Sequence, residues 1–168
     1  KKYEKIGFTL LAQRNSHKAF DADKDGFTDM PELEKFNFNP KLVFYVSDKT
    51  NLSVGGTFTT EKRQGGDTKL LNNEALSTTH FYKEKNEVSR ITTQTKLSHK
   101  ITENQTFEFR NSFNLFDRSL LITPTFLDGE YKFEGKQFSS FSELSYSFKK
   151  KKNVLITGLN FYSDDFTE

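Results

Sequence analysis

The stretch that decides the fold is Phe107-Glu108-Phe109-Arg110-Asn111-Ser112-Phe113-Asn114-Leu115, in which large apolar residues occupy alternate positions. Successive side chains of a β-strand point to opposite faces, so this pattern predicts a strand with one dry face and one wet face. Asn111 interrupts the dry face. On the wet face lie charged and small polar residues.

The same alternation recurs along the chain and predicts about seven strands in all. Polar turns at 47–50, 102–105 and 149–152 join neighbouring strands into hairpins, and similar units start at Phe36, Ser89 and Gln137. The sequence thus predicts an all-β, antiparallel, up-and-down meander. The other six strands are expected around Ile6–Ala12, Phe36–Val46, Leu52–Phe58, Ile91–Ile101, Phe138–Phe148 and Leu155–Phe161.

Three long polar segments, 21–35, 62–88 and 119–136, are predicted as loops at the opposite end of the strands from the short turns. Structureless loops of this length are uncommon in compact soluble domains. Alternating strands, short turns at one end and long loops at the other are typical of a transmembrane β-barrel. In this interpretation phenylalanines at strand ends suit the aromatic girdles; they are Phe36, Phe38, Phe58 and Phe161.

A soluble β-sandwich explains the same alternation, because its apolar face packs on a second sheet and its polar face meets water. Alternation alone does not separate the two architectures. Both remain open at this point.

Composition excludes several other classes of protein. The chain has 168 residues, no cysteine, and a net charge of +2 from 25 basic and 23 acidic residues, so steering of nucleic acid by net charge is not expected. No window approaches the ~20 apolar residues of a membrane helix. The start, Lys1 to Arg14, has no small-residue cleavage site, and we do not expect it to be a signal peptide.

One segment matches a calcium-binding loop. Carboxylates at alternate positions, with Gly26 at the sixth, reproduce the twelve-residue EF-hand loop. The predicted metal ligands are Asp21, Asp23, Asp25, the Phe27 carbonyl, Asp29 and Glu32. The flanks do not read as helices, so we expect an isolated Ca²⁺ loop that orders the segment. An acidic surface loop that binds nothing is the alternative.

Other candidate motifs point to no chemistry. The run Lys149–Lys152 lies in a predicted turn and is interpreted as a solvated loop, and the three histidines show no ligand spacing. Gly65-Gly66-Asp67, after Arg63, is ordinary turn chemistry. No nucleotide-binding, nucleophile or zinc-protease motif is present, so we do not expect an enzyme.

Several stretches resemble TonB-dependent outer-membrane receptors. They are Phe20–Glu32, then Phe36-Asn37-Phe38-Asn39-Pro40-Lys41-Leu42, then Arg63-Gln64-Gly65-Gly66-Asp67, and Gly135–Glu143 at the entry to a strand. The likeness covers nearly the whole chain and rests on barrel strands. Neither a plug domain nor a TonB box is present.

The resemblance implies an internal segment of a larger, 22-stranded barrel in the bacterial outer membrane. It implies uptake of a scarce small-molecule ligand, such as a siderophore–metal chelate or a cofactor, with the TonB complex as an indirect partner. Outer-membrane lipid and the remaining barrel and plug are the other expected partners, and nucleic acid is not expected. The alternative function is a soluble, extracellular, calcium-stabilised β-sheet binding module.

Overall fold

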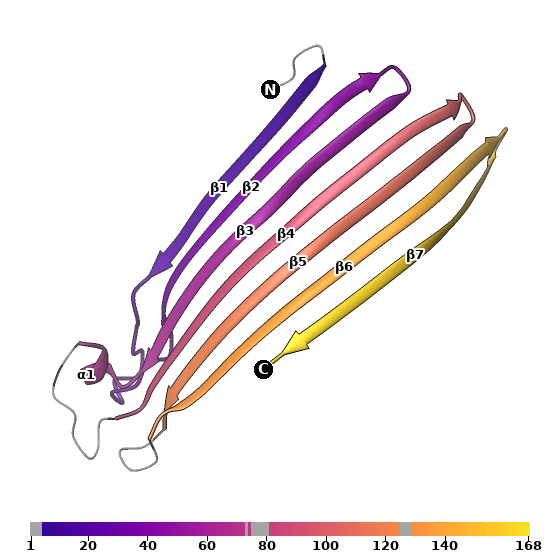
Figure 1. Ribbon diagram of the computed structural model, residues 1–168. Helices are drawn as coiled ribbons and strands as arrows, with labels where there is room; N and C mark the ends of the chain where they lie inside the picture. Colours follow the sequence, from indigo (N-terminus) through magenta and orange to yellow (C-terminus); the bar gives the residue numbers. More distant parts are fainter. Residues whose placement is uncertain (1–4, 73, 75–80, 125–128) are drawn as a thin grey trace.

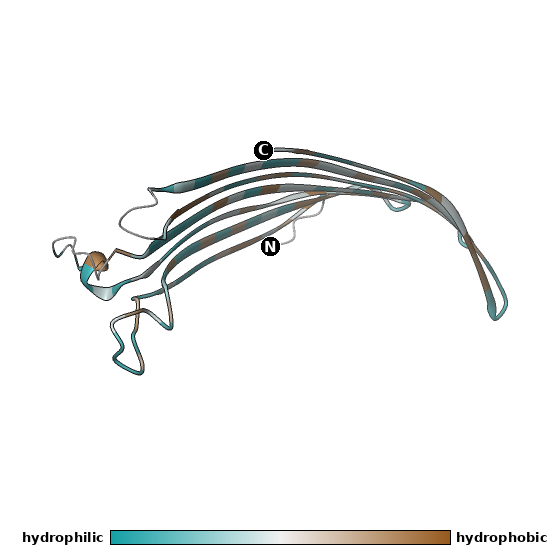
Figure 2. Cartoon of the chain, turned by 90° about the horizontal axis from the view of Figure 1, so that it is seen from below, coloured by the Kyte–Doolittle hydropathy of each residue, from teal (hydrophilic) through white to brown (hydrophobic). Residues whose placement is uncertain are grey.

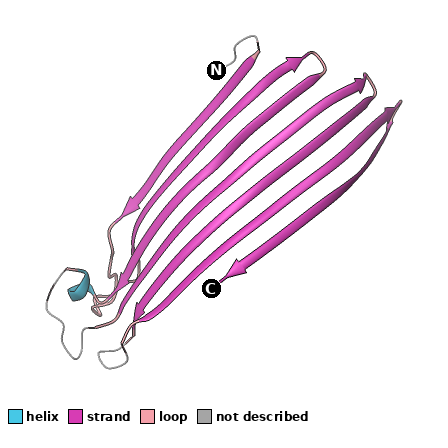
Figure 3. Cartoon of the chain, in the orientation of Figure 1, coloured by secondary structure: helices cyan, strands magenta, loops and turns pink. Residues whose placement is uncertain are grey.

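The computed structural model describes residues 5–72, 74, 81–124 and 129–168, and most of them lie in seven long strands (Figures 1 and 3). A short helix, α1 (Thr68–Leu71), follows the third strand. The strands are β1 (Ile6–His17), β2 (Glu32–Ser47), β3 (Thr50–Gly66), β4 (Lys83–Thr102), β5 (Gln105–Thr123), β6 (Tyr131–Lys150) and β7 (Asn153–Thr167).

The strands form one antiparallel sheet in sequence order, β1 to β7. The predicted all-β antiparallel meander of seven strands is therefore confirmed. The sheet is not closed, since β1 and β7 do not pair with each other. In Figure 1 the short hairpin turns lie together at one end of the sheet and the long connections lie at the other end. We call these the turn end and the loop end.

The register puts the alternating apolar residues of all seven strands on the same face. Residues directly opposite each other in a ladder point to the same side, and the pairs Phe44↔Leu52, Leu97↔Phe109 and Leu144↔Leu159 belong to one such set. We call this side the apolar face and the other the polar face. A shift of one residue in any strand would exchange its two faces.

The described residues contain no buried hydrophobic side chain. The molecule is a single curved layer, as Figure 2 shows, with apolar and polar residues alternating along the strands. Twenty-seven large hydrophobic residues of the described part of the chain are exposed, and Leu159 on β7 has 79% of its surface accessible. A domain normally buries such a face against a second layer.

The strands extend into all three segments predicted as loops. The connections run over 18–31, 67–82 and 124–130, so 32–35, 62–66, 83–88, 119–123 and 131–136 belong to strands. Apart from 119–123, which are Ser-Leu-Leu-Ile-Thr, these strand ends carry charged residues on the face that is apolar elsewhere, so that they read as loop in the sequence although their backbone ladders continue. Residues 73, 75–80 and 125–128 of the predicted loops lie outside the described residues.

Within the described ranges, no helix is long and apolar enough to cross a membrane.

Candidate functional site: a two-faced sheet and an acidic loop

One row of residues across the sheet is apolar at every strand. Starting from Ile6 on β1, each residue pairs with the next, and the row reaches Leu159 on β7. Its members are Ile6, Phe44, Leu52, Leu97, Phe109, Leu144 and Leu159. No strand is an exception, so the apolar surface runs across the whole width of the sheet.

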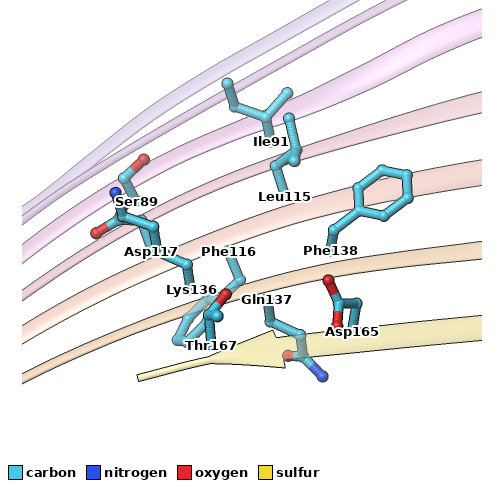
Figure 4. Close-up of a pocket in the computed structure, with 10 residues that line it drawn as sticks. All are labelled: Ser89, Ile91, Leu115, Phe116, Asp117, Lys136, Gln137, Phe138, Asp165 and Thr167. Atoms are coloured by element: carbon cyan, nitrogen blue, oxygen red, sulfur yellow. The ribbon is translucent and has the colours of Figure 1, made fainter.

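On β3 to β6 this apolar surface ends sharply toward the loop end. The row Phe58, Ile91, Leu115, Phe138 is followed on the same face by the row Thr60, Ser89, Asp117, Lys136. On β7 the surface ends earlier, because Asp165 pairs with Phe138, and on β2 it ends later, because Phe36 pairs with Thr60. Figure 4 shows this step, with Ile91, Leu115 and Phe138 side by side and Ser89, Asp117 and Lys136 next to them. Lys136 Nζ lies 4.0 Å from Asp117 Oδ2. We use the name apolar band for the part of the apolar face that extends from the row Phe58, Ile91, Leu115, Phe138 to the turn end.

The height of the apolar band matches that of a bilayer core. Along β6 the band runs from Phe138 to Phe148, which is about 33 Å at 3.3 Å per residue and projects to about 25 Å at a strand tilt of about 40°. The lipid-facing band of outer-membrane barrels is about 25 Å tall. Phe36, Phe38 and Phe58 lie near the loop-end limit of the band, as expected for a girdle, whereas Phe161 lies inside it, opposite Ser142.

Asn111, a polar residue inside the band, finds hydrogen-bond partners within the sheet. Asn111 Nδ2 donates to Ser142 Oγ at 2.9 Å and to the Phe141 carbonyl at 3.2 Å. These bonds satisfy both amide hydrogens of Asn111 and lower the cost of holding it among apolar neighbours. The interruption of the dry face is thus compatible with an apolar environment.

The polar face opposite the band carries a chain of four charges from three strands. Lys96 Nζ lies 2.8 Å from Glu108 Oε1, and Arg110 bridges Glu108 Oε2 at 2.7 Å and Glu143 Oε1 at 3.2 Å. A second group joins Lys35 and Arg63 to Glu61 at 2.8 and 2.6 Å. Charges of this density need water or other polar groups next to them.

Three of the predicted metal ligands meet in the β1–β2 connection. Carboxylate oxygens of Asp21, Asp23 and Asp29 lie within 4.8 Å of one another. The bridge between Phe20 and Met30 closes the loop behind them, with Phe20 N donating to the Met30 carbonyl at 2.9 Å. The backbone turns through left-handed conformations at Lys24 and Gly26.

The carboxylates of Asp25 and Glu32 are not part of this group. Asp25 Oδ1 accepts the Phe27 amide at 2.8 Å, and Glu32 begins β2, where it pairs with Gln64. Asp21 accepts two backbone amides, from Lys24 at 2.7 Å and Gly26 at 3.0 Å. Three carboxylates fit the start of a Ca²⁺ shell of six to eight oxygens, so the remaining oxygens would come from carbonyls and water.

The acidic loop is fastened to the sheet at the glycine pair that ends β3. Thr28 N donates to the Gly66 carbonyl at 2.9 Å, and Gly66 N donates to Thr28 Oγ1 at 2.9 Å. The next residue, Asp67, is fully buried and caps α1 by accepting the Lys69 amide at 2.9 Å. Gly66 has a φ of +123°, and a Cβ there would meet the Tyr82 carbonyl. This requirement explains the glycine at position 66.

Tyr82 sits beside this junction, in the connection before β4. Its hydroxyl donates to Glu84 Oε2 at 3.2 Å. Burial first, and then the negative charge of Glu84, raise the pKa of the Tyr82 hydroxyl. The neutral phenol is therefore the form that the folded structure favours.

The charge chain through Lys96 and Arg110 could not be assembled from the sequence. Glu108 and Arg110 are expected on the wet face from the sequence, but their contacts with Lys96 and Glu143 depend on the register between β4, β5 and β6. The buried position of Asp67 was also missed, because Gly-Gly-Asp reads as a surface turn. The feature of the sequence that could have revealed it is Asp67 itself, because Asp is a preferred helix N-cap residue and α1 begins at the next residue, Thr68.

No family model, curated protein or solved structure matches this chain.

Proposed function

We propose that the chain is a segment of a transmembrane β-barrel in the bacterial outer membrane. The observation that carries the proposal is the apolar row that crosses all seven strands and faces no second layer among the described residues. Lipid is the surface that covers such a face in a barrel. Strands of 15 to 20 residues, seen from β2 to β7, are longer than the ~9–11 that cross a bilayer, which agrees with strands that continue beyond it.

The two faces of the sheet support this assignment over a soluble sandwich. In a barrel the polar face lines a wet lumen or meets a polar plug, and the charge chain Lys96–Glu108–Arg110–Glu143 fits either. The unpaired edges at β1 and β7 would be paired by the remaining strands of the barrel, because lipid does not tolerate an open edge.

The activity proposed for the whole barrel is TonB-dependent uptake of a scarce small molecule, such as a metal chelate or a cofactor. The proposal draws on the resemblance of Phe20–Glu32, Phe36–Leu42 and Gly135–Glu143 to receptors of that kind. In this role the chain supplies scaffold and loops, and no step of catalysis.

Membrane fractionation tests the barrel. The full-length protein that contains this chain should sediment with outer membranes, resist carbonate extraction and need detergent to stay monodisperse. A protein that is monodisperse and cooperatively folded in plain buffer would contradict the barrel. Uptake is tested separately: ligand-dependent growth should disappear when the TonB complex is deleted, and growth that persists would exclude TonB-dependent transport.

We also propose that the acidic loop binds calcium, because Asp21, Asp23 and Asp29 gather there. The dissociation constant expected of an extracellular module is roughly 10⁻⁴ to 10⁻³ M. Calorimetric titration of the wild type, Asp21→Asn and Asp25→Asn separates the cases. Asp21→Asn should abolish the binding heat, while Asp25→Asn, outside the cluster, should weaken it less. Equal heats in all three proteins would exclude this site.

A further inference from the structure

The turn end carries a group of lysines that the proposed function leaves unexplained. The hairpin ends bring them to one edge of the sheet, together with the start of β1 (Figure 1). Among the described residues, seven lysines and two acidic residues, Asp48 and Glu103, lie there. We call this group the basic rim; its members are Lys5, Lys49, Lys100, Lys149, Lys150, Lys151 and Lys152.

Backbone hydrogen bonds hold the parts of the basic rim next to one another. Lys100 N donates to the Lys49 carbonyl at 2.8 Å and Lys149 N to the Asn104 carbonyl at 2.8 Å, which links the three hairpin ends in a row. Tyr45 N donates to the Lys5 carbonyl at 2.9 Å. The hairpin ends are therefore neighbours along one edge of the sheet, although their lysines are far apart in the sequence. Because side chains alternate along a strand, Lys150 lies on the apolar face and Lys100 and Lys149 lie on the polar face.

The lysines of the turn end differ from several lysines of the loop end in their partners. At the loop end Lys62 and Lys85 contact Glu87, and Lys132 contacts Glu134. All seven lysines of the basic rim are exposed, and none has an ion pair within the described part of the chain. The chain has almost as many acids as bases, so this imbalance is local.

The basic rim adjoins the apolar band directly. Phe148 precedes Lys149, and Leu155, which is 62% exposed, follows the same turn. An apolar surface bordered by a row of unpaired ammonium groups matches the boundary between acyl chains and phosphate headgroups. We propose that the basic rim binds the phosphates of anionic phospholipids in the leaflet at the turn end. This inference rests on the proposed barrel.

Lipid selectivity measured at the turn end tests the proposal. A fluorophore on Ser47→Cys, in the otherwise cysteine-free full-length protein in bilayers, reports quenching by brominated phosphatidylglycerol and, separately, brominated phosphatidylcholine. We expect the anionic lipid to be favoured by about three-fold or more. Because screening shortens the reach of these charges to about 3 Å at 1 M salt, the preference should fall at that ionic strength.

Two matched triple variants test whether the lysines of the basic rim cause the preference for anionic lipid. Lys149→Gln, Lys150→Gln and Lys152→Gln together should bring the ratio close to one, whereas Lys18→Gln, Lys69→Gln and Lys83→Gln, at the loop end, should preserve it. Lys151 stays unchanged because its φ is positive. Equal quenching by the two lipids in the wild type, or equal effects of the two triple variants, would overturn the proposal that the basic rim binds anionic phospholipids. Quenching by neither lipid would instead contradict the barrel.

Discussion

The turn-end half of the sheet and its loop end are built on the same strands, yet their apolar-face residues are opposite in kind. The row from Ile6 to Leu159, near the turn end, is apolar throughout, whereas a row about 33 Å nearer the loop end contains only polar residues. That second row is Ser16, Glu34, Lys62, Glu87, Ser119 and Glu134. One continuous backbone ladder thus passes through two environments, and the side chains mark the border.

The largest effect should come from placing a charge on each side of that border. Phe113→Arg, in the band, should cost about 2–4 kcal/mol of the free energy of unfolding in a bilayer, because in the proposed barrel the charge would replace a lipid-facing ring near the midplane. Ser119→Arg, six residues along the same face of β5, should cost little. Urea titration of both variants in vesicles measures the difference, and equal costs would mean that the border does not exist.

A second comparison concerns the fastening of the acidic loop at the loop end. Gly66 and Gly26 both have positive φ, but only at Gly66 would a Cβ meet neighbouring backbone. Gly66→Ala should destabilise the junction by about 2 kcal/mol or more, and Gly26→Ala by about 1 kcal/mol. The rate of hydrogen exchange at the Thr28 and Asp67 amides reports this destabilisation, since both amides donate to backbone carbonyls at the junction. Equal protection in both variants would contradict the tight approach.

The polar face at the level of the band should respond more weakly than the apolar face. Arg110→Ala removes the cation shared by Glu108 and Glu143 and should cost about 1 kcal/mol or less, because the group is half exposed to solvent. Lys136→Ala, which breaks a single 4.0 Å pair at the border, should cost about nothing measurable. Urea midpoints compare the two. An Arg110→Ala cost as large as that of Phe113→Arg would mean that the polar face is dry.

The smallest expected effect is a shift in the ionisation of the Tyr82 hydroxyl, at the loop end. The pKa of Tyr82 is raised in the folded chain above its ordinary value of 10, through burial and Glu84. Its contribution to stability is therefore complete below pH 10 and is lost as pH rises through the folded pKa. The difference in tyrosinate absorbance between wild type and Tyr82→Phe should develop above pH 10. A transition at or below pH 10 would show that Tyr82 is not buried at the junction.

The sequence was informative where one face is apolar and misleading where it is not. Alternation from Phe107 to Leu115, and short polar turns such as Asp48-Lys49, were sufficient to predict the meander. At the loop end, Lys62 and Glu87 stand on the face that is apolar elsewhere, so their strands read as loops. Ladder hydrogen bonds do not depend on side-chain polarity, and the strands continue through these residues.

The acidic loop shows a different limit of prediction from sequence. Spacing alone placed six ligands around one cation, but the start of β2 fixes Glu32 in a ladder with Gln64. Asp25 is turned toward the Phe27 amide. Asp21, Asp23 and Asp29 remain together because the Phe20–Met30 bridge closes the loop around them. Such constraints come from the sheet and are invisible in a twelve-residue motif.

The central claim is that the apolar face meets lipid and the polar face meets water. Single cysteines at successive positions from Phe107 to Asp117 on β5, in the full-length protein in bilayers, test it with one bilayer-soluble and one water-soluble thiol reagent. We predict that positions 107, 109, 113 and 115 react with the bilayer-soluble reagent, that 108, 110, 112 and 114 react with the water-soluble one, and that Asp117 reacts with the latter. Reaction of every position with the water-soluble reagent would contradict the account.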